Sequence, residues 1–539
     1  MIDNGYHIPV LLHAAVDGLV LNPNGIYVDV TFGGGGHSRE ILSRLGEAGN
    51  LIGFDQDVDA DNNKLDDSRF TLIGQNFKFL KNNLKLMKLS PVDGILADLG
   101  VSSHQFDSAE RGFSFRFNSL LDMRMDKNQS YRNVNNCFLC KSTKLTNIFK
   151  ANEIALTGVF PKIEEDDPIK TPINLNICNE CSNLQIAEIV EKGLMFNNYW
   201  YRSGTTKSMV KHFEKILNAI KEIKNNGTLL DIGCNDCTFL EIANNNGYNS
   251  YGIEPSVAYE DRKILDDKKI ANDFFPTEKN WSLDVSKFDI ITAISMFYDV
   301  EDPNKFLLEC KKRLNKNGLL LIEVNYAKTF LERKNVDMLG QEHLIFYFIK
   351  TFQEIIKKVG LHLNDAELNE MNGGNIVFIC GTEVHQSDRL LKLIHEEKKF
   401  IQNFDFLTFQ KNVDLDFKKL KKKIEKINLD KKKLKIYGAS TRGAFICQYL
   451  KLSNEHFDCA VDIQLNKDGR RIPGTNIKIE MEKDTEKPDT YLILPYQFLD
   501  EFIKKNLLFL KNGGTFLCFR PSNIEISMSQ DGKIIKTNY

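Results

Sequence analysis

The sequence lacks the features of a membrane protein or an exported protein. No apolar run reaches the roughly 18 residues that a membrane-spanning helix needs. The first seven residues are mostly polar and contain no apolar core of a signal peptide. The 11 cysteines among 539 residues are too few for a disulfide scaffold. We therefore expect a cytoplasmic protein.

A strong excess of one charge is also missing. The formal net charge is −2, which argues against a chain that binds nucleic acid over its whole surface, although a local patch can still bind RNA. Apolar residues make up 42% of the chain, which is enough for several packed cores. The length predicts about three to four domains.

A phosphate-binding GxGxxG pattern is absent from the stretch that best predicts a ligand site, residues 228–256, TLLDIGCNDCTFLEIANNNGYNSYGIEPS. The stretch predicts a strand, a tight turn at Gly233, a helix and a second strand that ends at Glu254. Cys237 stands where a late glycine of that pattern is expected. Glu254 can accept hydrogen bonds from a ribose diol. A nucleoside without phosphates therefore fits better than a dinucleotide.

This stretch resembles the first motif of class I S-adenosylmethionine (SAM) methyltransferases, and the alternative is an α/β domain without a SAM site. The resemblance implies a Rossmann-like domain over residues 201–384 with a seven-stranded sheet. Further strands are predicted just before residue 271 and at 288–295, 318–324 and 375–380, with helices at 303–314 and near 352–359. The residues implied in SAM binding are Asp231, Gly233, Asn235, Asp236, Glu254, Asp273 near the adenine, and Ser295 near the methionine part.

A second, partial Rossmann-like pattern occupies residues 1–130. Strands predicted at 26–31, 51–54 and 94–97 lead into a run of four glycines, Asp55 and Asp98, respectively. The glycines allow a ligand to approach the backbone closely, and Ser38 is predicted to cap the following helix. The alternative is a flexible glycine-rich turn.

Six motifs in this segment resemble the bacterial 16S ribosomal RNA cytosine-N(4) methyltransferases. They are HIPVLL (7–12), DVTFGGGGHS (29–38), GFDQD (53–57), DGILADLGVSSHQFD (93–107), RGFSF (111–115) and LDMRMD (121–126). The resemblance implies ribosomal RNA as a partner. It also implies SAM contacts from Gly35, Gly36, His37, Asp55, Phe77, Asp98 and Gln105.

The resemblance to the RNA methyltransferases ends at about Asp126. We therefore expect about four strands of a sheet that has seven in the complete family, which leaves one sheet edge open. A gene fusion, or a chimeric gene model, explains the abrupt change in sequence. Residues 127–136 are polar and are predicted to form a linker.

Two CxxC pairs in residues 131–200 predict a metal site. Cys137 and Cys140 form one pair, and Cys178 and Cys181 form the other. Four thiolates suit one tetrahedral zinc ion, and the long segment between the pairs must then fold back. Two disulfides are the alternative, which a chain without an export signal disfavours. Because four sulfur ligands close the coordination shell, we expect a structural zinc without a catalytic role.

Candidate chemistry follows the fifth predicted strand, at Gln341-Glu342-His343. Loops at the carboxyl ends of strands carry the active sites in this architecture. His343 can act as a general base near neutral pH, and Glu342 can orient it or raise its pKa. The alternative is that the pair belongs to an ordinary surface loop.

From about Cys137 to the C-terminus, the chain resembles sugar C-methyltransferases, which methylate a nucleotide-linked keto sugar. The motifs are the two CxxC pairs, YWYRSG (199–204), LLDIGCNDCTFL (229–240), GIEPS (252–256), FYDVEDP (297–303) and QEHLIFYF (341–348). The resemblance implies that Tyr201, Glu342 and His343 lie at the sugar, with His343 removing the proton next to the ketone. Three positions differ from the family pattern: Cys237 replaces a glycine, Asp299 a histidine and Gly340 a tyrosine.

The last part of the chain is predicted to contain a helical connection at 385–435 and an α/β domain at 436–539. The lysine-rich segment 417–433 is either an amphipathic helix with a solvated face or an RNA-binding strip. Residues 435–443 predict a strand, a glycine turn and a helix. The resemblance implies that Gly438, Ser440 and Arg442 bind the nucleotide sugar, because helix N-terminal amides and an arginine suit a diphosphate.

The primary hypothesis is therefore a SAM-dependent sugar C-methyltransferase that carries a truncated RNA-methyltransferase-like segment. A second hypothesis assigns the activity to that segment, acting on ribosomal RNA. A third is a non-catalytic binding protein with an altered SAM site, which the differences at Cys237 and Gly340 motivate.

Overall fold

The computed structural model describes residues 9, 11–100, 116, 131–190, 195, 202–261, 269–277, 281–520 and 522–539. The chain divides into two compact units, Met1–Arg132 and Asn133–Tyr539. This division lies close to the predicted boundary at residue 130. Among the described residues, no helix is both long and apolar enough to span a bilayer.

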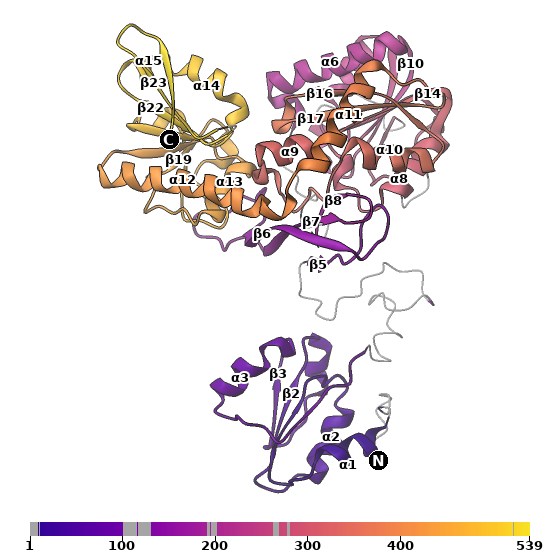
Figure 1. The fold of residues 1–539 in the computed structure, drawn as a ribbon, viewed down its shortest axis with the longest axis vertical. Coiled ribbons are helices and arrows are strands. Elements are labelled where there is room, and N and C mark those ends of the chain that lie inside the picture. Colours follow the sequence, from indigo (N-terminus) through magenta and orange to yellow (C-terminus); the bar gives the residue numbers. More distant parts are fainter. Residues whose placement is uncertain are drawn as a thin grey trace. The chain divides into compact units, whose positions relative to one another are not determined.

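The first unit contains a four-stranded sheet in the order β3-β2-β1-β4. Figure 1 labels its strands β2 and β3. The neighbouring strands are parallel, as expected for a Rossmann-like fold. Its strands are β1 (Ile26–Asp29), β2 (Asn50–Phe54), β3 (Phe70–Ile73) and β4 (Gly94–Leu96), and its helices are α1 (Leu12–Leu19), α2 (Gly36–Arg44) and α3 (Leu80–Leu86). The predicted count of about four strands is confirmed for the described residues.

The predicted helix cap at Ser38 is wrong. Helix α2 begins at Gly36, and its N-cap is Gly35, whose φ of 74° lies in the left-handed region that glycine adopts without strain. The Ser38 hydroxyl instead donates to the buried carboxylate of Asp29 at 2.8 Å. Ser38 therefore ties the first turn of α2 to β1.

The second unit begins with a small antiparallel sheet in the order β15-β8-β7-β6. Its strands are β6 (Leu145–Ala155), β7 (Lys170–Cys178), β8 (Leu184–Ile186) and β15 (Ile345–Phe346), and the short strand β9 (Glu188–Val190) follows β8. The long hairpin of β6 and β7 brings the two CxxC pairs together, as predicted. Part of the predicted linker, residues 131–133, forms strand β5 (Tyr131–Asn133), and residues 127–130 lie outside the described residues.

A seven-stranded sheet forms the centre of the second unit, in the order β12-β11-β10-β13-β14-β17-β16. The first five strands are parallel, whereas β17 is antiparallel to both β14 and β16. The strands are β10 (Gly227–Ile232), β11 (Tyr248–Ile253), β12 (Ile270–Ala271), β13 (Phe288–Ile294), β14 (Leu314–Asn325), β16 (His362–Asn369) and β17 (Asn375–Gly381).

Helices cover both faces of this sheet. Consecutive residues of its strands point to opposite faces, and both sets are apolar. Leu229 of β10 packs in one apolar cluster with α6 and α7, whereas Leu230 packs in another with α8 and α10. The helices are α6 (Lys207–Ile223), α7 (Thr238–Asn245), α8 (Pro303–Arg313), α9 (Ala327–Arg333) and α10 (Ile349–Lys358). The predicted seven-stranded sheet is confirmed, although β16 was not predicted individually.

Two long helices lead to the last domain, α11 (Asp388–Asn403) and α12 (Phe409–Leu429). The buried residues of α12 recur at helical spacing from Phe409 to Ile427, while most of its lysines are exposed. The amphipathic-helix interpretation of this segment is therefore confirmed.

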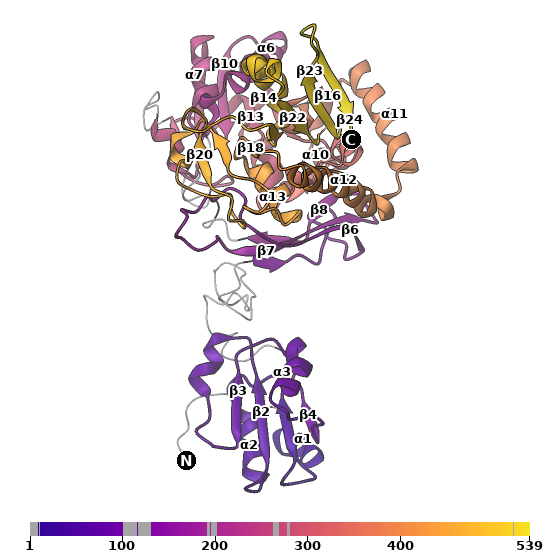
Figure 2. The ribbon, with the colours of Figure 1, turned by 90° about the vertical axis from the view of Figure 1, so that its left-hand side faces the viewer.

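The last domain contains a second seven-stranded sheet, in the order β20-β19-β18-β21-β22-β23-β24. Helices α12 and α13 pack on one face, and α14 and α15 on the other (Figures 1 and 2). The elements are β18 (Leu434–Tyr437), α13 (Thr441–Tyr449), β19 (Ala460–Asp462), β20 (Ile479–Met481), β21 (Thr490–Ile493), α14 (Leu499–Lys505), α15 (Leu507–Lys511), β22 (Thr515–Cys518), β23 (Ile524–Met528) and β24 (Ile534–Asn538).

Candidate functional site

The turn between β10 and α7 has left-handed backbone at three positions, Gly233, Asn235 and Cys237. Gly233 has a φ of 76°, and a Cβ on it would lie 2.9 Å from the Cγ of Met296, so only glycine fits here. Cys237, in the place of the expected glycine, has a φ of 61° as the N-cap of α7. The turn therefore keeps its shape with cysteine at this position, at the steric cost that left-handed backbone carries for a side chain with a Cβ.

Glu254 is fixed at the end of β11, beside this turn. One carboxylate oxygen accepts the backbone N–H of Asn235 at 2.8 Å. The other accepts the backbone N–H and the hydroxyl of Ser256, at 3.0 and 2.6 Å. These bonds hold the carboxylate where the sequence predicts the ribose, and they join the segments that follow β10 and β11.

Asn235 and Asp236 hold the segment that precedes α6. The backbone N–H of Ser203 donates to Asn235 Oδ1 at 3.0 Å, and that of Gly204 donates to Asp236 Oδ2 at 2.9 Å. Both side chains therefore fix the backbone of residues 203–204 beside the turn. Their direct contact with SAM remains a prediction.

Asp231 lies buried under the turn, on β10. Burial raises its pKa to about 7, although the Thr292 hydroxyl, which donates at 2.7 Å, partly offsets this effect. The negative charge of Glu254 raises the pKa further. A cationic ligand at this position would favour the ionised form of Asp231.

The predicted residues Asp273 and Ser295 follow the ends of β12 and β13. Asp273 is half-buried two residues beyond β12. Ser295 has a φ of 55°, and its hydroxyl donates to Glu323 Oε2 at 3.1 Å and accepts from Asn375 at 3.3 Å. The carboxyl ends of the parallel strands thus bring the predicted SAM residues to one edge of the sheet.

A buried polar cluster beside Ser295 was not predicted. His212 Nε2 lies 2.9 Å from Glu323 Oε1, and Asn369 donates to the same oxygen at 2.8 Å. Burial raises the pKa of Glu323, but the hydrogen bonds from His212, Asn369 and Ser295 outweigh burial and lower it overall. The sequence feature that could have revealed this cluster is Glu323, a glutamate inside the apolar run of β14.

The imidazole of His343 is oriented by its own loop. Its Nδ1 lies 2.7 Å from the carbonyl oxygen of Met338, which requires a proton on Nδ1 and leaves the lone pair on Nε2. The Tyr298 ring packs edge-on against the imidazole, with centroids 4.5 Å apart. Burial lowers the pKa of His343, although the charge of Glu342 opposes this effect. The imidazole is therefore neutral near pH 7, as a general base requires.

Asp299 faces the same loop, and its carboxyl group is buried near the charge of Glu342. Burial, followed by the charge of Glu342, raises the pKa of Asp299 well above its usual range. Its Oδ1 atom is buried without a hydrogen-bond partner among the described residues. The Tyr347 hydroxyl, also buried, likewise lacks a partner in the described chain. The charge of Asp299 acts on the pKa of Tyr347, so the two unpaired groups lie near each other.

Arg442 joins the sheet domain to the last domain. It forms an ion pair with the buried Asp337 at 2.6 Å and hydrogen-bonds to the hydroxyl of Tyr496. Its Nη1 atom has no hydrogen-bond partner among the described residues, and its charge acts on His343. The predicted nucleotide-sugar residue therefore lies near the candidate base.

Gly438 and Ser440, the other predicted sugar-nucleotide residues, shape the turn before α13. Gly438 has a φ of 87°, and a Cβ on it would lie 2.5 Å from Pro495. The Ser440 hydroxyl accepts the backbone N–H of Gly443 at 3.0 Å and so caps α13. Both residues set the local backbone, and their contact with a ligand remains a prediction.

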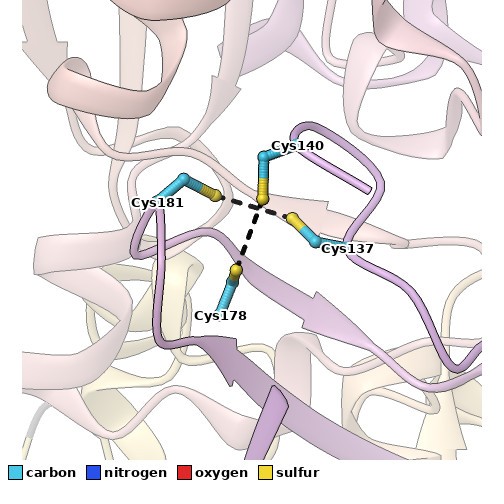
Figure 3. A group of neighbouring side chains, drawn as sticks. All are labelled: Cys137, Cys140, Cys178 and Cys181. Carbon is cyan, nitrogen blue, oxygen red and sulfur yellow. Dashed lines mark hydrogen bonds between the residues drawn. The ribbon is translucent and has the colours of Figure 1, made fainter. Parts of the chain in front are cut away.

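The four predicted metal ligands converge (Figure 3). All four Sγ atoms lie within 4.8 Å of one another, and Cys137–Cys181 and Cys140–Cys178 are 3.5 and 3.6 Å apart. Four thiolates about 2.3 Å from a tetrahedral zinc ion stand about 3.8 Å apart, so the cluster fits this metal. The cysteines are free thiols, and the pKa of Cys137 is lowered to about 5 because Cys181 hydrogen-bonds to it.

The first unit contains a second group of predicted SAM residues. The backbone N–H of Gly33 donates to Asp55 Oδ2 at 2.7 Å. Burial raises the pKa of Asp55, although the backbone hydrogen bonds that it accepts oppose this effect. His37 Nδ1 lies 3.8 Å from the Asp98 carboxylate, which is largely exposed.

Of the remaining predicted SAM residues of the first unit, the structure describes three. Gly35 and Gly36 form the start of α2, and Phe77 is 44% exposed. Gln105, and Tyr201 of the second unit, lie outside the described residues.

Family matches give the class of the chain: its parts are similar to domains of SAM-dependent methyltransferases, enzymes that transfer one-carbon groups. Three family models match separate parts of it. Residues 4–157 match the MraW methylase family, residues 206–365 a methyltransferase domain, and residues 370–521 the C-methyltransferase C-terminal domain. These matches confirm both resemblances. The first match extends to residue 157, beyond the predicted end near Asp126.

The curated relatives share the N-terminal part of the chain. The ribosomal RNA small subunit methyltransferase H of Bacteroides thetaiotaomicron is 56% identical over 144 residues, 27% of this chain and 47% of that protein. The enzyme of the same name from Flavobacterium johnsoniae is 64% identical over 133 residues, 24% of this chain and 44% of that protein. The chain thus spans about half the length of the curated relatives it matches.

Solved structures with similar folds include two SAM-dependent methyltransferases. The one from Mesorhizobium loti is 13% identical, covers 31% of this chain and 96% of that chain, and gives a TM-score of 0.26. The one from Clostridium acetobutylicum is 12% identical, and the match covers 34% of this chain and 94% of that chain. Its TM-score is also 0.26.

Proposed function

We propose that the second unit methylates a carbon atom of a nucleotide-linked keto sugar, with SAM as the methyl donor. The observation that carries the proposal is the orientation of His343, whose Nδ1 is occupied by Met338 and whose Nε2 is left as a base. The match of residues 370–521 to a C-methyltransferase C-terminal domain supports transfer to carbon.

The residues around the β10 turn would hold SAM, which supplies a methyl group attached to a positively charged sulfur. The fixed carboxylate of Glu254 suits the ribose hydroxyl groups, and Gly233 allows the backbone to approach the ligand. Asp273 and Ser295 would border the adenine and the methionine part. Asp231 would be ionised when the cationic cofactor is bound, because a nearby positive charge favours the carboxylate.

His343 would remove a proton from the carbon next to the sugar ketone. The ketone is required because it takes up the electron pair of the broken C–H bond as an enolate. Burial keeps the imidazole neutral and therefore able to accept the proton. Glu342 would stabilise the imidazolium that forms, and Tyr201 is proposed to contact the sugar.

Arg442, Gly438 and Ser440 are proposed to bind the nucleotide part of the acceptor. Asp337 occupies two nitrogens of the Arg442 guanidinium and leaves Nη1 for a phosphate oxygen. The four cysteines are proposed to hold a structural zinc ion, because their spacing and chemistry fit it.

A second candidate function belongs to the first unit. Its similarity to ribosomal RNA small subunit methyltransferases favours methylation of a cytosine N4 atom in small-subunit ribosomal RNA. Against this candidate, the described residues supply four sheet strands, compared with seven in the second unit. We propose this activity as the weaker alternative.

The test is methyl transfer from labelled SAM by the full-length chain, offered nucleotide-linked 4-keto sugars and, separately, small-subunit ribosomal RNA. We expect product from a keto sugar, and its loss in His343→Ala, with the exposed His395→Ala on α11 as the matched control. Wild-type turnover by His343→Ala would refute the base assignment. Methylation of the RNA alone would favour the second candidate, and SAM binding without any turnover would favour a binding protein.

A further inference from the structure

The loop that carries His343 is fastened to the small sheet of the cysteine module. Strand β15 begins two residues after His343 and pairs antiparallel with β8, with Ile345 opposite Gln185. The backbone N–H of Ile186 also donates to the Leu344 carbonyl at 3.0 Å. The residue directly after the candidate base is therefore hydrogen-bonded to another module of the same unit.

The residues before His343 are fastened to the same sheet. Gln341 is 2% exposed, and its Nε2 donates to the carbonyl of Ile154 in β6 at 3.0 Å. A weaker contact of 3.4 Å reaches the hydroxyl of Thr171 in β7. Both ends of the short segment that contains Glu342 and His343 are thus hydrogen-bonded to the cysteine module, and the backbone N–H of Leu344 also donates to the carbonyl of Tyr298 at 3.0 Å.

Gln185 of β8 connects this sheet to the cysteine cluster. Its buried Oε1 accepts the backbone N–H of Phe138, which lies between Cys137 and Cys140, at 2.9 Å. Its Nε2 donates to the carbonyl of Asn136 at 3.1 Å. The same Oε1 accepts from Asn183 at 2.9 Å. One side chain therefore touches the first CxxC pair and the strand that holds the base.

The second CxxC pair reaches β8 through the same residues. The backbone N–H of Cys178 donates to the carbonyl of Asn183 at 2.8 Å, and β8 starts three residues after Cys181. A metal ion bound by all four sulfurs would fix both pairs relative to each other. Both pairs would then fix β8.

We propose that the four-cysteine site positions the catalytic base: metal bound there holds β8, and β8 holds the segment with His343 through β15. Gln185 is the positioning residue that links the two. The metal touches no substrate, so this role is compatible with a closed four-sulfur shell. The inference rests on the proposed function only for its activity readout, because its contacts are independent of the acceptor.

A general stabilising role for the metal predicts a different outcome. Loss of the metal would then loosen the whole unit, including β10 and β11 of the SAM pocket. A positioning role predicts loosening confined to β8, β15 and residues 341–346, with the SAM pocket intact. The two roles are separable because no cysteine ligand belongs to the seven-stranded sheet.

The first experiment is amide hydrogen exchange on the full chain, loaded with zinc and then treated with a chelator, with no acceptor present. We expect exchange at residues 184–186 and 344–346 to accelerate at least about tenfold on chelation, while β10 and β11 stay protected. Unchanged exchange at residues 344–346, or equal acceleration across the unit, would overturn the proposal.

The second experiment compares Gln185→Met with Lys144→Ala, which removes only the exposed ion pair with Glu180 beside the second CxxC pair. For Gln185→Met we expect unchanged SAM affinity and a kcat about 100-fold lower, because small misplacements of a catalytic group cost about this much. We also expect the pKa of His343 to return toward its ordinary value of about 6.5 as the loop opens to water.

Wild-type kcat and pH dependence in Gln185→Met would overturn the proposal. If the wild-type chain methylates no keto sugar, the proposed function fails, and the exchange experiment still decides whether the cysteine site holds the loop.

Discussion

At the scale of single residues, the surroundings of His343 fix the tautomer and the charge of the proposed base. The carbonyl of Met338 selects the tautomer, and burial keeps the ring neutral. The sequence predicted this residue as the base and placed it after the fifth strand, but it did not predict helix α9, which lies between β14 and the loop of His343. It could not indicate the tautomer, because Met338 contacts the ring through a backbone atom that any residue supplies.

The lowered pKa of His343 predicts the acid side of the activity profile. Because the folded protein binds this proton more weakly than an ordinary histidine, kcat/KM should stay level through about pH 6.5 and fall only below it. Stability should also decline below about pH 6.5, since protonation then favours the unfolded chain. A pH series of methyl transfer checks this, and a midpoint above pH 6.5 would contradict it.

Asp299 should be protonated at neutral pH. Burial and the charge of Glu342 both raise its pKa, and no cation pairs with it in the described chain. Difference infrared spectra of the wild type against Asp299→Asn at pH 7 should show the carbonyl stretch of a carboxylic acid that the variant lacks. A carboxylate band instead of the acid band would contradict this assignment.

At the scale of elements, apolar periodicity predicted the strands that lie in the middle of the sheet. Strand β16 escaped individual prediction because its sequence, HLNDAELN, is largely polar and lies at the edge of the sheet. The cap of α2 was misassigned because the pattern of four glycines does not show which of them turns left-handed. The buried cluster of His212, Glu323 and Asn369 joins three separate elements, so no local pattern revealed it.

Helix α12 should stabilise the second unit through its apolar face. Phe417 is 1% exposed and packs against Tyr449 and Phe519, each with a centroid distance of 5.0 Å. Phe417→Ala should reduce the free energy of unfolding by about 3–5 kcal/mol. The exposed Lys419→Ala on the same helix should change it by less than about 0.5 kcal/mol. Equal effects in denaturant titrations would contradict the packing account.

At the scale of the whole molecule, the sheet of the first unit has four described strands, whereas the related central sheet of the second unit has seven. The strand order β3-β2-β1-β4 of the first unit repeats the order β12-β11-β10-β13 of the second. In the second unit, β14, β17 and β16 complete the sheet beyond β13. The sequence predicted this difference because the motifs of the first family stop early. It could not show that β15, next to the candidate base, pairs with β8 of the cysteine module, because that pairing joins segments more than 150 residues apart.

The central claim is that the second unit contains the working SAM site. Calorimetric titration of the full-length chain with SAM tests it most directly, together with the matched variants Glu254→Ala and Asp55→Ala, which remove the ribose-type carboxylate from the second and first units, respectively. The account predicts one binding site, lost in Glu254→Ala and unchanged in Asp55→Ala. Two sites, or one site that survives Glu254→Ala and disappears in Asp55→Ala, would contradict it.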